Sequence, residues 1–366
     1  MRFRSVIFDV AGVCNARCAY CVTGAKSANP GAIMTADTFD AALHNLERLN
    51  LIDSRSVLEL YNWGELFLHP DLQNVIRVIN DHNLRYSIST NASVLPQIDE
   101  AFVKNLIAVK FSMCGFSQQS YDRIHKLEFD RIRENIATIV SRLRSLGYKG
   151  YIEICFHVYR WNTNELRECQ RFAKDLGVVL LFLDAYLLDW WQFEGFIQGT
   201  LPDEKRRQIL DDLFIDEKKL RSARTGWRCP EWNRLVIDER ENVPVCCGLP
   251  NNNPSYSLGA VDDGLAERLR NRPNLPICKT CLESGIGYRW FHPTFKGESS
   301  LTWMLRFTMM NWRVLWTRTK TDWRRFGAKQ MLYNHIYAQA IRMLASSVSK
   351  VYQKCIKSLK KVGGNG

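Results

Sequence analysis

The sequence predicts an α/β protein built on a parallel sheet, and three observations favour this class. Six apolar, strand-like runs are spaced through the first 200 residues, at residues 5–10, 57–62, 86–90, 109–113, 151–158 and 178–184. Amphipathic helical patterns lie between these runs, and alternating strands and helices are typical of a parallel sheet with crossover helices. The chain has 366 residues, of which 46% are hydrophobic, so it can bury a full core.

The helical patterns have apolar residues three and four positions apart. The clearest cover residues 38–49, 132–146 and 164–176. The first places Phe39, Leu43 and Leu46 on one face, and the other two end at Gly147 and Gly177. A glycine directly after the last turn is a helix stop signal, so these segments are predicted helices.

Composition excludes several classes of protein. Twelve cysteines could indicate a secreted disulfide scaffold, but such scaffolds are usually much shorter. The first residues do not read as a signal peptide, and no run of about 18 apolar residues predicts a membrane-spanning helix. We therefore expect reduced thiols and a cytoplasmic protein.

The most informative motif is the run CNARCAYC, which carries Cys14, Cys18 and Cys21 directly after the first predicted strand. Iron–sulfur clusters are usually held by four Cys thiolates, so three can bind three irons of a four-iron cube and leave the fourth iron open. A structural zinc site is the alternative. It would need a second nearby pair of ligands, which the following residues do not supply.

This run, with Tyr20 as its aromatic residue, resembles the cluster loop of the radical S-adenosylmethionine (SAM) family. The resemblance implies a partial, six-unit (β/α)6 TIM-like barrel and a [4Fe–4S] cluster whose open iron binds SAM. It implies reductive cleavage of SAM to a 5′-deoxyadenosyl radical, which abstracts hydrogen from a substrate. It also implies a flavodoxin- or ferredoxin-type electron donor, and Tyr20 as a cofactor-binding residue.

A second motif lies at the end of the second predicted strand. Residues 61–65 read YNWGE and resemble the family's G-G-E motif, which makes Asn62, Gly64 and Glu65 candidate SAM-binding residues near the methionine amine. Glycine permits a close approach of the backbone. The sequence departs from the family at Trp63, where a first glycine is usual, and at Leu66, where proline is frequent.

Polar residues also end the third and fourth predicted strands. Thr90, Asn91 and Ser112 resemble family positions that hold the SAM ribose or carboxylate, although short polar residues at such places are also common turn formers. The family often has an aspartate two positions after that serine. Here the residue is Cys114, so a role copied from the aspartate does not carry over.

The fifth predicted strand alternates between two kinds of side chain. In the run YIEICFHVY the polar set includes Glu153, Cys155 and His157, while the residues between them are apolar. In a barrel this polar face would look into the lumen, which makes these three residues active-site candidates. An edge strand with one solvated face is the alternative.

A second cysteine group comprises Cys229, Cys246, Cys247, Cys278 and Cys281. On ligand count zinc would suit it as well as iron. The setting resembles the auxiliary-cluster module of radical SAM enzymes (SPASM, or the shortened twitch form). This implies one auxiliary [4Fe–4S] cluster on Cys229, Cys246, Cys278 and Cys281, with Cys246 favoured over Cys247. We expect residues 235–243 to form a two-stranded hairpin that presents Cys246.

These signals divide the chain into three expected parts. Residues 1–215 form the radical SAM core barrel, and residues 216–300 form a small auxiliary-cluster domain with a β-hairpin and a helix. Residues 301–366 form a basic, Trp-rich amphipathic helical tail with 13 Lys and Arg and one acid. Such a tail is typical of contact with the inner face of a membrane. Packing on the barrel and nucleic-acid binding are the alternatives, and no nucleic-acid-binding motif supports the latter.

The predicted reaction is hydrogen abstraction from a carbohydrate-type substrate, a small molecule or a lipid-linked glycan, by dehydrogenation or epimerisation. The single auxiliary site and the lack of a fused leader-binding domain favour this substrate class. An epimerase needs a thiol that returns hydrogen, and Cys114, Cys155 and Cys247 are the candidates. The alternatives are a peptide or protein maturase and, outside enzymes, a metal-bound scaffold on a membrane surface.

Overall fold

The fold is known from a computed structural model of the chain. It describes residues 2–24, 31–185, 187, 189–215, 229–249 and 254–283. The predicted tail at residues 301–366 lies outside these ranges. Among the helices of the described ranges, none combines the length and apolar character that a membrane crossing requires.

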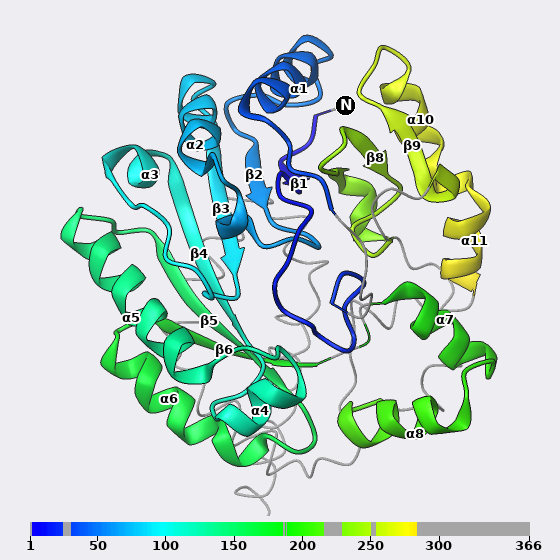
Figure 1. The fold of residues 1–366 in the computed structure, drawn as a ribbon. Helices are drawn as coiled ribbons and strands as arrows, with labels where there is room; N and C mark the ends of the chain where they lie inside the picture. Colours follow the sequence, from blue (N-terminus) through cyan, green and yellow to red (C-terminus); the bar gives the residue numbers. More distant parts are fainter. Residues whose placement is uncertain are drawn as a thin grey trace, which may run out of the picture. The chain divides into compact units, whose positions relative to one another are not determined.

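A seven-stranded sheet is the centre of the fold, in the order β6-β5-β4-β3-β2-β1-β7 (Figure 1). All neighbouring strands in it are parallel. The strands are β1 (Ser5–Phe8), β2 (Val57–Leu60), β3 (Arg85–Thr90), β4 (Leu106–Met113), β5 (Tyr151–Val158), β6 (Val179–Asp184) and β7 (Arg234–Ile237). The first six confirm the sequence prediction, and the whole is an α/β fold consistent with a partial TIM-like barrel.

The helices that follow the first five strands gather on one side of the sheet, where Figure 1 shows α1, α2, α3, α5 and α6. Gly147 and Gly177 follow α5 and α6 with positive φ angles of 72° and 59°, as their stop signals predict. The helices are α1 (Ala36–Arg48), α2 (Leu72–Asp81), α3 (Glu100–Lys104), α4 (Gln118–Arg123), α5 (Phe129–Ser145), α6 (Leu166–Asp175), α7 (Trp190–Gln198), α8 (Asp203–Asp212), α10 (Leu265–Asn271) and α11 (Pro276–Glu283).

The two faces of the sheet differ in chemistry. The helix-covered face is apolar, and Phe8 of β1 meets Phe39 of α1 edge to face with ring centroids 4.8 Å apart. The other face is polar, because the register aligns Lys110 of β4 with Glu153 of β5, and Ser112 with Cys155. We call this polar side the inner face. Since β5 lies between β4 and β6, the alternative of an edge strand is wrong.

The seventh strand corrects the predicted hairpin at residues 235–243. The chain does turn there, with the Asp238 amide donating to the Asn242 carbonyl at 2.9 Å. However, β7 pairs with β1 in the large sheet, whereas β8 (Asn242–Pro244) pairs antiparallel with β9 (Ser257–Ala260). The hairpin of the auxiliary region is therefore β8–β9, because the apolar β7 run finds a partner in the open edge of β1.

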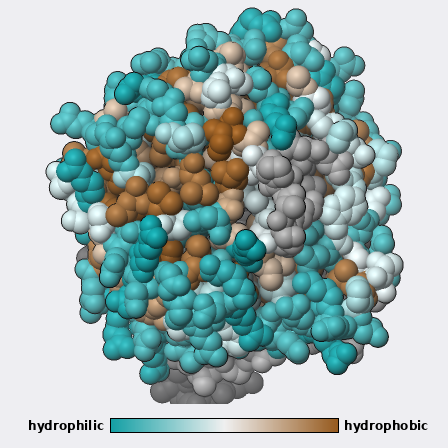
Figure 2. Space-filling view, in the orientation of Figure 1, coloured by the Kyte–Doolittle hydropathy of each residue, from teal (hydrophilic) through white to brown (hydrophobic). Residues whose placement is uncertain are grey.

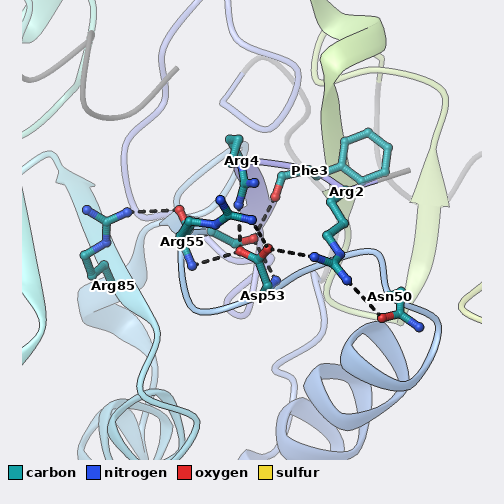
Figure 3. Close-up of polar contacts among 8 residues, drawn as sticks. Arg2, Phe3, Arg4, Asn50, Asp53, Arg55 and Arg85 are labelled. Atoms are coloured by element: carbon teal, nitrogen blue, oxygen red, sulfur yellow. Dashed lines mark hydrogen bonds and ion pairs between the residues drawn. The ribbon is translucent and has the colours of Figure 1, made fainter. Parts of the chain in front are cut away.

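A cluster of ion pairs around Asp53 lies at the amino-terminal ends of the strands, which we call the amino edge of the sheet (Figure 3). The Asp53 carboxylate lies 2.6 Å from Arg4, 3.1 Å from Arg55 and 3.4 Å from Arg2. Burial opposes its ionisation, but the Arg55 amide and the guanidinium groups of Arg55 and Arg4 outweigh burial and lower the pKa of Asp53 to about 2. This cluster ties the starts of β1 and β2 together.

Figure 2 shows a largely hydrophilic surface with one hydrophobic band, in the area where Figure 1 draws β3 and β4. Only Leu95 and Trp191 are strongly exposed among the large hydrophobic residues of the described ranges.

Candidate active site

The cysteines of the CNARCAYC run lie on the loop that leaves the carboxyl end of β1. The loop turns tightly, since the Cys21 amide donates to the Cys18 carbonyl at 3.2 Å. Burial is the main effect that raises the pKa of the Cys14 thiol to about 12, and nearby Glu65 and Cys21 raise it further. Burial likewise raises the pKa values of Cys18 and Cys21, and the Cys18 thiol lies within electrostatic range of the other two.

This donor set fits an iron–sulfur cluster. Three partly buried thiols within electrostatic range of one another are costly to ionise when nothing positive is nearby. A cluster binds thiolates and supplies that positive charge, so its binding offsets the cost. The side-chain amide of Asn91 approaches the Cys14 sulfur at 3.8 Å, which is the kind of outer contact that orients a sulfur ligand.

The end of β2 is bound directly to this loop. The backbone amides of Trp63 and Gly64 donate to the Asp9 carboxylate at 3.0 and 3.3 Å, and the Glu65 amide donates to the Val13 carbonyl at 2.7 Å. A Cβ on Gly64 would lie 1.5 Å from the carbonyl oxygen of Ala11. Only glycine allows this approach, which gives the predicted Gly64 a physical reason.

Glu65 joins the ends of β2 and β3 through its carboxylate. The side chain is 3% exposed and accepts hydrogen bonds from the Thr90 hydroxyl at 2.6 Å, the Asn91 amide at 2.7 Å and the Phe67 amide at 3.2 Å. Burial raises its pKa, and these hydrogen bonds oppose the rise. The predicted residues Glu65, Thr90 and Asn91 therefore form one network, in which Glu65 holds the end of β3 against the end of β2.

The two residues that precede Gly64 have distinct surroundings. Trp63, which departs from the family motif, is buried and its indole nitrogen donates to the Leu249 carbonyl at 2.9 Å. It thus links the β2 end to the segment that carries the second cysteine group. The side-chain nitrogen of Asn62 is buried and has no hydrogen-bond partner among the described residues.

The inner-face residues of β4 and β5 form a second group. Ser112 contacts the His157 imidazole at 3.2 Å, and burial lowers the pKa of His157 to about 4, so this ring is neutral near pH 7. Glu153 accepts hydrogen bonds from the Tyr151 hydroxyl at 2.5 Å and the Cys155 thiol at 2.8 Å. Ser112 is therefore joined to the inner-face group through its contact with His157.

The three candidate hydrogen-donor thiols occupy different places. Cys155 lies on the inner face beside Glu153. Cys114 is fully buried, and its sulfur lies 3.7 Å from the Ser120 carbonyl. Cys247 donates to the Glu231 carboxylate at 3.1 Å.

Tyr20 faces the protein interior. It is 3% exposed, and its hydroxyl donates to the Asp212 carboxylate. Asp212 also accepts hydrogen bonds from Arg123 and from the Trp161 indole at 3.0 Å, so it joins the cysteine loop to α4 and α8. Sequence reasoning missed Asp212 and Asp9, because a single carboxylate outside a recognised motif carries no signal of its own.

The second cysteine group surrounds a small cavity of about 40 Å³. Four of its five cysteines line it: Cys229, Cys246, Cys278 and Cys281. The rest of the lining is mainly aromatic and aliphatic, with Trp232 donating a hydrogen bond to the Cys278 sulfur. Cys247 is not among the lining residues, and its thiol is directed to Glu231. Four convergent thiols in apolar surroundings fit a metal centre with complete cysteine ligation.

Comparison with known proteins identifies the class to which this fold belongs. A scan against protein-family models finds no match, and a search of curated proteins finds no relative. Solved structures do match, and those reported below are of radical SAM enzymes.

The structure of anSMEcpe with bound AdoMet and a Kp18Cys peptide matches with a TM-score of 0.50 at 15% identity, over 85% of this chain and 98% of that chain. Streptococcus suis SuiB bound to the precursor peptide SuiA gives 0.49 at 11% identity, over 75% of this chain and 65% of SuiB, less than two thirds of its length. BtrN in complex with AdoMet and 2-DOIA gives 0.41 at 14% identity, over 79% and 89%. The chain has the fold of the radical SAM superfamily.

Proposed function

We propose that this chain is a radical SAM enzyme. The observation that carries the proposal is the convergence of three partly buried thiols with the ends of β2 and β3, bonded into one unit through Asp9, Glu65 and Asn91. In the proposed enzyme, the chemistry that a [4Fe–4S] cluster with SAM supplies is reductive cleavage to a 5′-deoxyadenosyl radical, which abstracts a hydrogen atom from the substrate.

The residues of the chain have distinct proposed roles. Cys14, Cys18 and Cys21 hold the cluster, and Gly64 lets the chain after β2 pack closely against the backbone of the loop that carries them, at Ala11. Asn62, whose side-chain nitrogen is buried and without an acceptor in the described part of the chain, binds a polar group of SAM. Glu65 braces the ends of β2 and β3, because its carboxylate is already engaged by three donors.

We propose an auxiliary [4Fe–4S] cluster on Cys229, Cys246, Cys278 and Cys281. Support comes from the cavity that these four side chains line and from the different direction of Cys247. The Trp63–Leu249 hydrogen bond fixes the segment that follows Cys246 to the β2 end. It would hold the auxiliary cluster at a constant distance from the SAM site.

For the substrate we favour a carbohydrate-type molecule. The polar inner face supports this class, because Ser112, Glu153 and Tyr151 are groups that hydrogen-bond hydroxyls. A peptide substrate is the second candidate, favoured by the peptide-bound anSMEcpe structure that shares the fold. The flavodoxin- or ferredoxin-type donor and the membrane contact of residues 301–366 stay predictions.

Anaerobic reconstitution with iron and sulfide tests the proposal. With SAM and dithionite the reconstituted chain should form 5′-deoxyadenosine, and the triple variant C14A/C18A/C21A should form none. The matched control is Cys169→Ala, a buried thiol on α6 away from both cysteine groups. An iron-loaded wild-type protein without this product, or a triple variant as active as wild type, would refute it.

Substrate and outcome can be tested together. Panels of nucleotide sugars and of short peptides should be screened for faster 5′-deoxyadenosine formation, with the sugars expected to respond. In deuterium oxide an epimerase that uses Cys155 incorporates deuterium at carbon, and C155A loses this incorporation. Unchanged incorporation in C155A would exclude Cys155, and product oxidised without deuterium would favour dehydrogenation.

A further inference from the structure

The buried guanidinium of Arg272 lies beside the second cysteine group. Arg272 follows α10 and is 1% exposed. Its Nη1 donates to the carbonyls of Arg234 at 3.1 Å and Val245 at 3.2 Å. Val245 directly precedes Cys246, so these bonds hold the positive charge against the segment that carries a proposed cluster ligand.

The rest of the guanidinium has no partner of its own. Its Nε and Nη2 donors are buried and find no hydrogen-bond acceptor among the described residues. After burial, the largest electrostatic effects on the guanidinium come from the Cys246 thiol, from Glu231, and from the thiols of Cys229 and Cys278. Glu231 already accepts from Arg234 at 3.0 Å and from Cys247 at 3.1 Å, and no ion pair joins it to Arg272 in the described part of the chain.

A buried, unpaired positive charge is strongly unfavourable unless an anion compensates it. Neutral thiols do not provide one. A four-thiolate metal centre does, because four thiolates exceed the positive charge of a [4Fe–4S] core and leave the centre anionic. The two free N–H groups are also the kind of donors that bind cluster sulfurs.

We infer that Arg272 is the counter-charge of the auxiliary centre, and that it makes the centre easier to reduce and holds the metal more firmly. The inference rests on the auxiliary cluster proposed above. Arg272 is a positioning residue and not a catalytic one, since it acts through the centre. Cluster potentials depend on nearby charge and on hydrogen bonds to sulfur, so removing this charge should lower the potential.

The test uses the full chain in the C14A/C18A/C21A background, where the auxiliary site is the one cluster site left. Into it we introduce Arg272→Met, Arg272→Lys and, as a control, Arg268→Met. Arg268 lies on α10 but is partly exposed, and its guanidinium is 2.9 Å from the Asp262 carboxylate. Two quantities are measured: the iron content per chain, and the midpoint potential of the cluster. The potential is obtained from a redox titration in which electron paramagnetic resonance detects the reduced cluster.

R272M should titrate at a more negative potential than the background and lose iron faster to a chelator. R272K, which keeps the charge, should stay near the background potential, and R268M should be unchanged. If R272M does not fold, Arg272→Gln retains donors for the two carbonyls and carries the same prediction.

Two failures can be told apart. The auxiliary centre itself is refuted if the C14A/C18A/C21A protein binds no cluster and the C278A/C281A variant of the wild-type chain binds as much iron as wild type. A background protein with a full cluster, whose potential and iron retention are the same in R272M or R272Q, refutes the role of Arg272 alone.

Discussion

The amino-terminal and carboxyl-terminal ends of the strands, the amino edge and the carboxyl edge of the large sheet, differ in how burial and neighbouring charges shift pKa values. At the amino edge Asp53 is ionised among arginines, and its pKa falls to about 2. At the carboxyl edge burial raises the pKa values of Cys14 and Glu65. The negative charge of Asp53 is compensated by arginines of the chain. In the proposed enzyme, the thiolates at the carboxyl edge would be compensated by the cluster, whose binding would stabilise the protein.

The largest effect is expected from Gly64→Ala at the carboxyl edge. The new methyl group would lie 1.5 Å from the Ala11 carbonyl oxygen, so the cysteine loop must move. Iron bound at the N-terminal site should fall to less than half of the wild-type value, measured by iron analysis after reconstitution of a C278A/C281A background.

Gly147→Ala is the matched control for this change. Its methyl group meets no atom within 4 Å, but its φ of +72° makes alanine unfavourable. It should cost about 1 kcal/mol of stability and leave iron binding intact. Equal iron loss in both variants would show that general destabilisation, rather than the close approach at Gly64, is responsible.

A smaller effect is expected from Glu65→Gln. An amide cannot accept from all three donors that the carboxylate serves, so one buried N–H or O–H loses its partner. We expect a loss of ~1–3 kcal/mol in the free energy of unfolding of the metal-free chain, measured in urea. Glu134→Gln on the exposed side of α5 should stay within about 0.5 kcal/mol of wild type. If Glu65→Gln left the free energy of unfolding unchanged, the proposed role of Glu65 in holding β2 and β3 together would be contradicted.

The smallest effect is expected from Asp53→Asn at the amino edge. Partly exposed ion pairs contribute at most about 1 kcal/mol at neutral pH. Because the folded pKa is lowered, wild type gains this stability above the ordinary carboxyl pKa and loses it as the pH falls toward 2. Urea unfolding at pH 7, 4 and 3 should show the two proteins converging, with SAM cleavage at pH 7 unchanged. A difference as large at pH 3 as at pH 7, or a loss of cleavage, would break the contrast between the edges.

The sequence predicts elements whose information is local. The alternation of residues 151–158 matches β5 in full, and Gly147 and Gly177 end their helices as predicted. The sequence prediction misplaced β7, because a short strand does not reveal which strand it pairs with. The partner of β7 is β1, which lies more than 200 residues earlier in the chain.

The candidate site divides in the same way. The cysteine spacing and the Gly64–Glu65 pair are visible in sequence, since they follow motifs. The part played by Trp63 is not, because its hydrogen bond to Leu249 joins residues far apart in the chain. Asp9 and Asp212 likewise acquire their roles from what folding brings near them.

The pairing of β7 with β1 has a consequence for synthesis of the chain. Ser5 pairs with Arg234, so one side of β1 stays open until the ribosome has added 229 more residues. At ~5–20 residues per second this takes roughly 10–45 s. During that time an apolar strand with unpaired backbone groups can join another chain. A nascent chain therefore needs protection of β1 until β7 emerges, and the adjoining cysteine loop becomes fully supported only then.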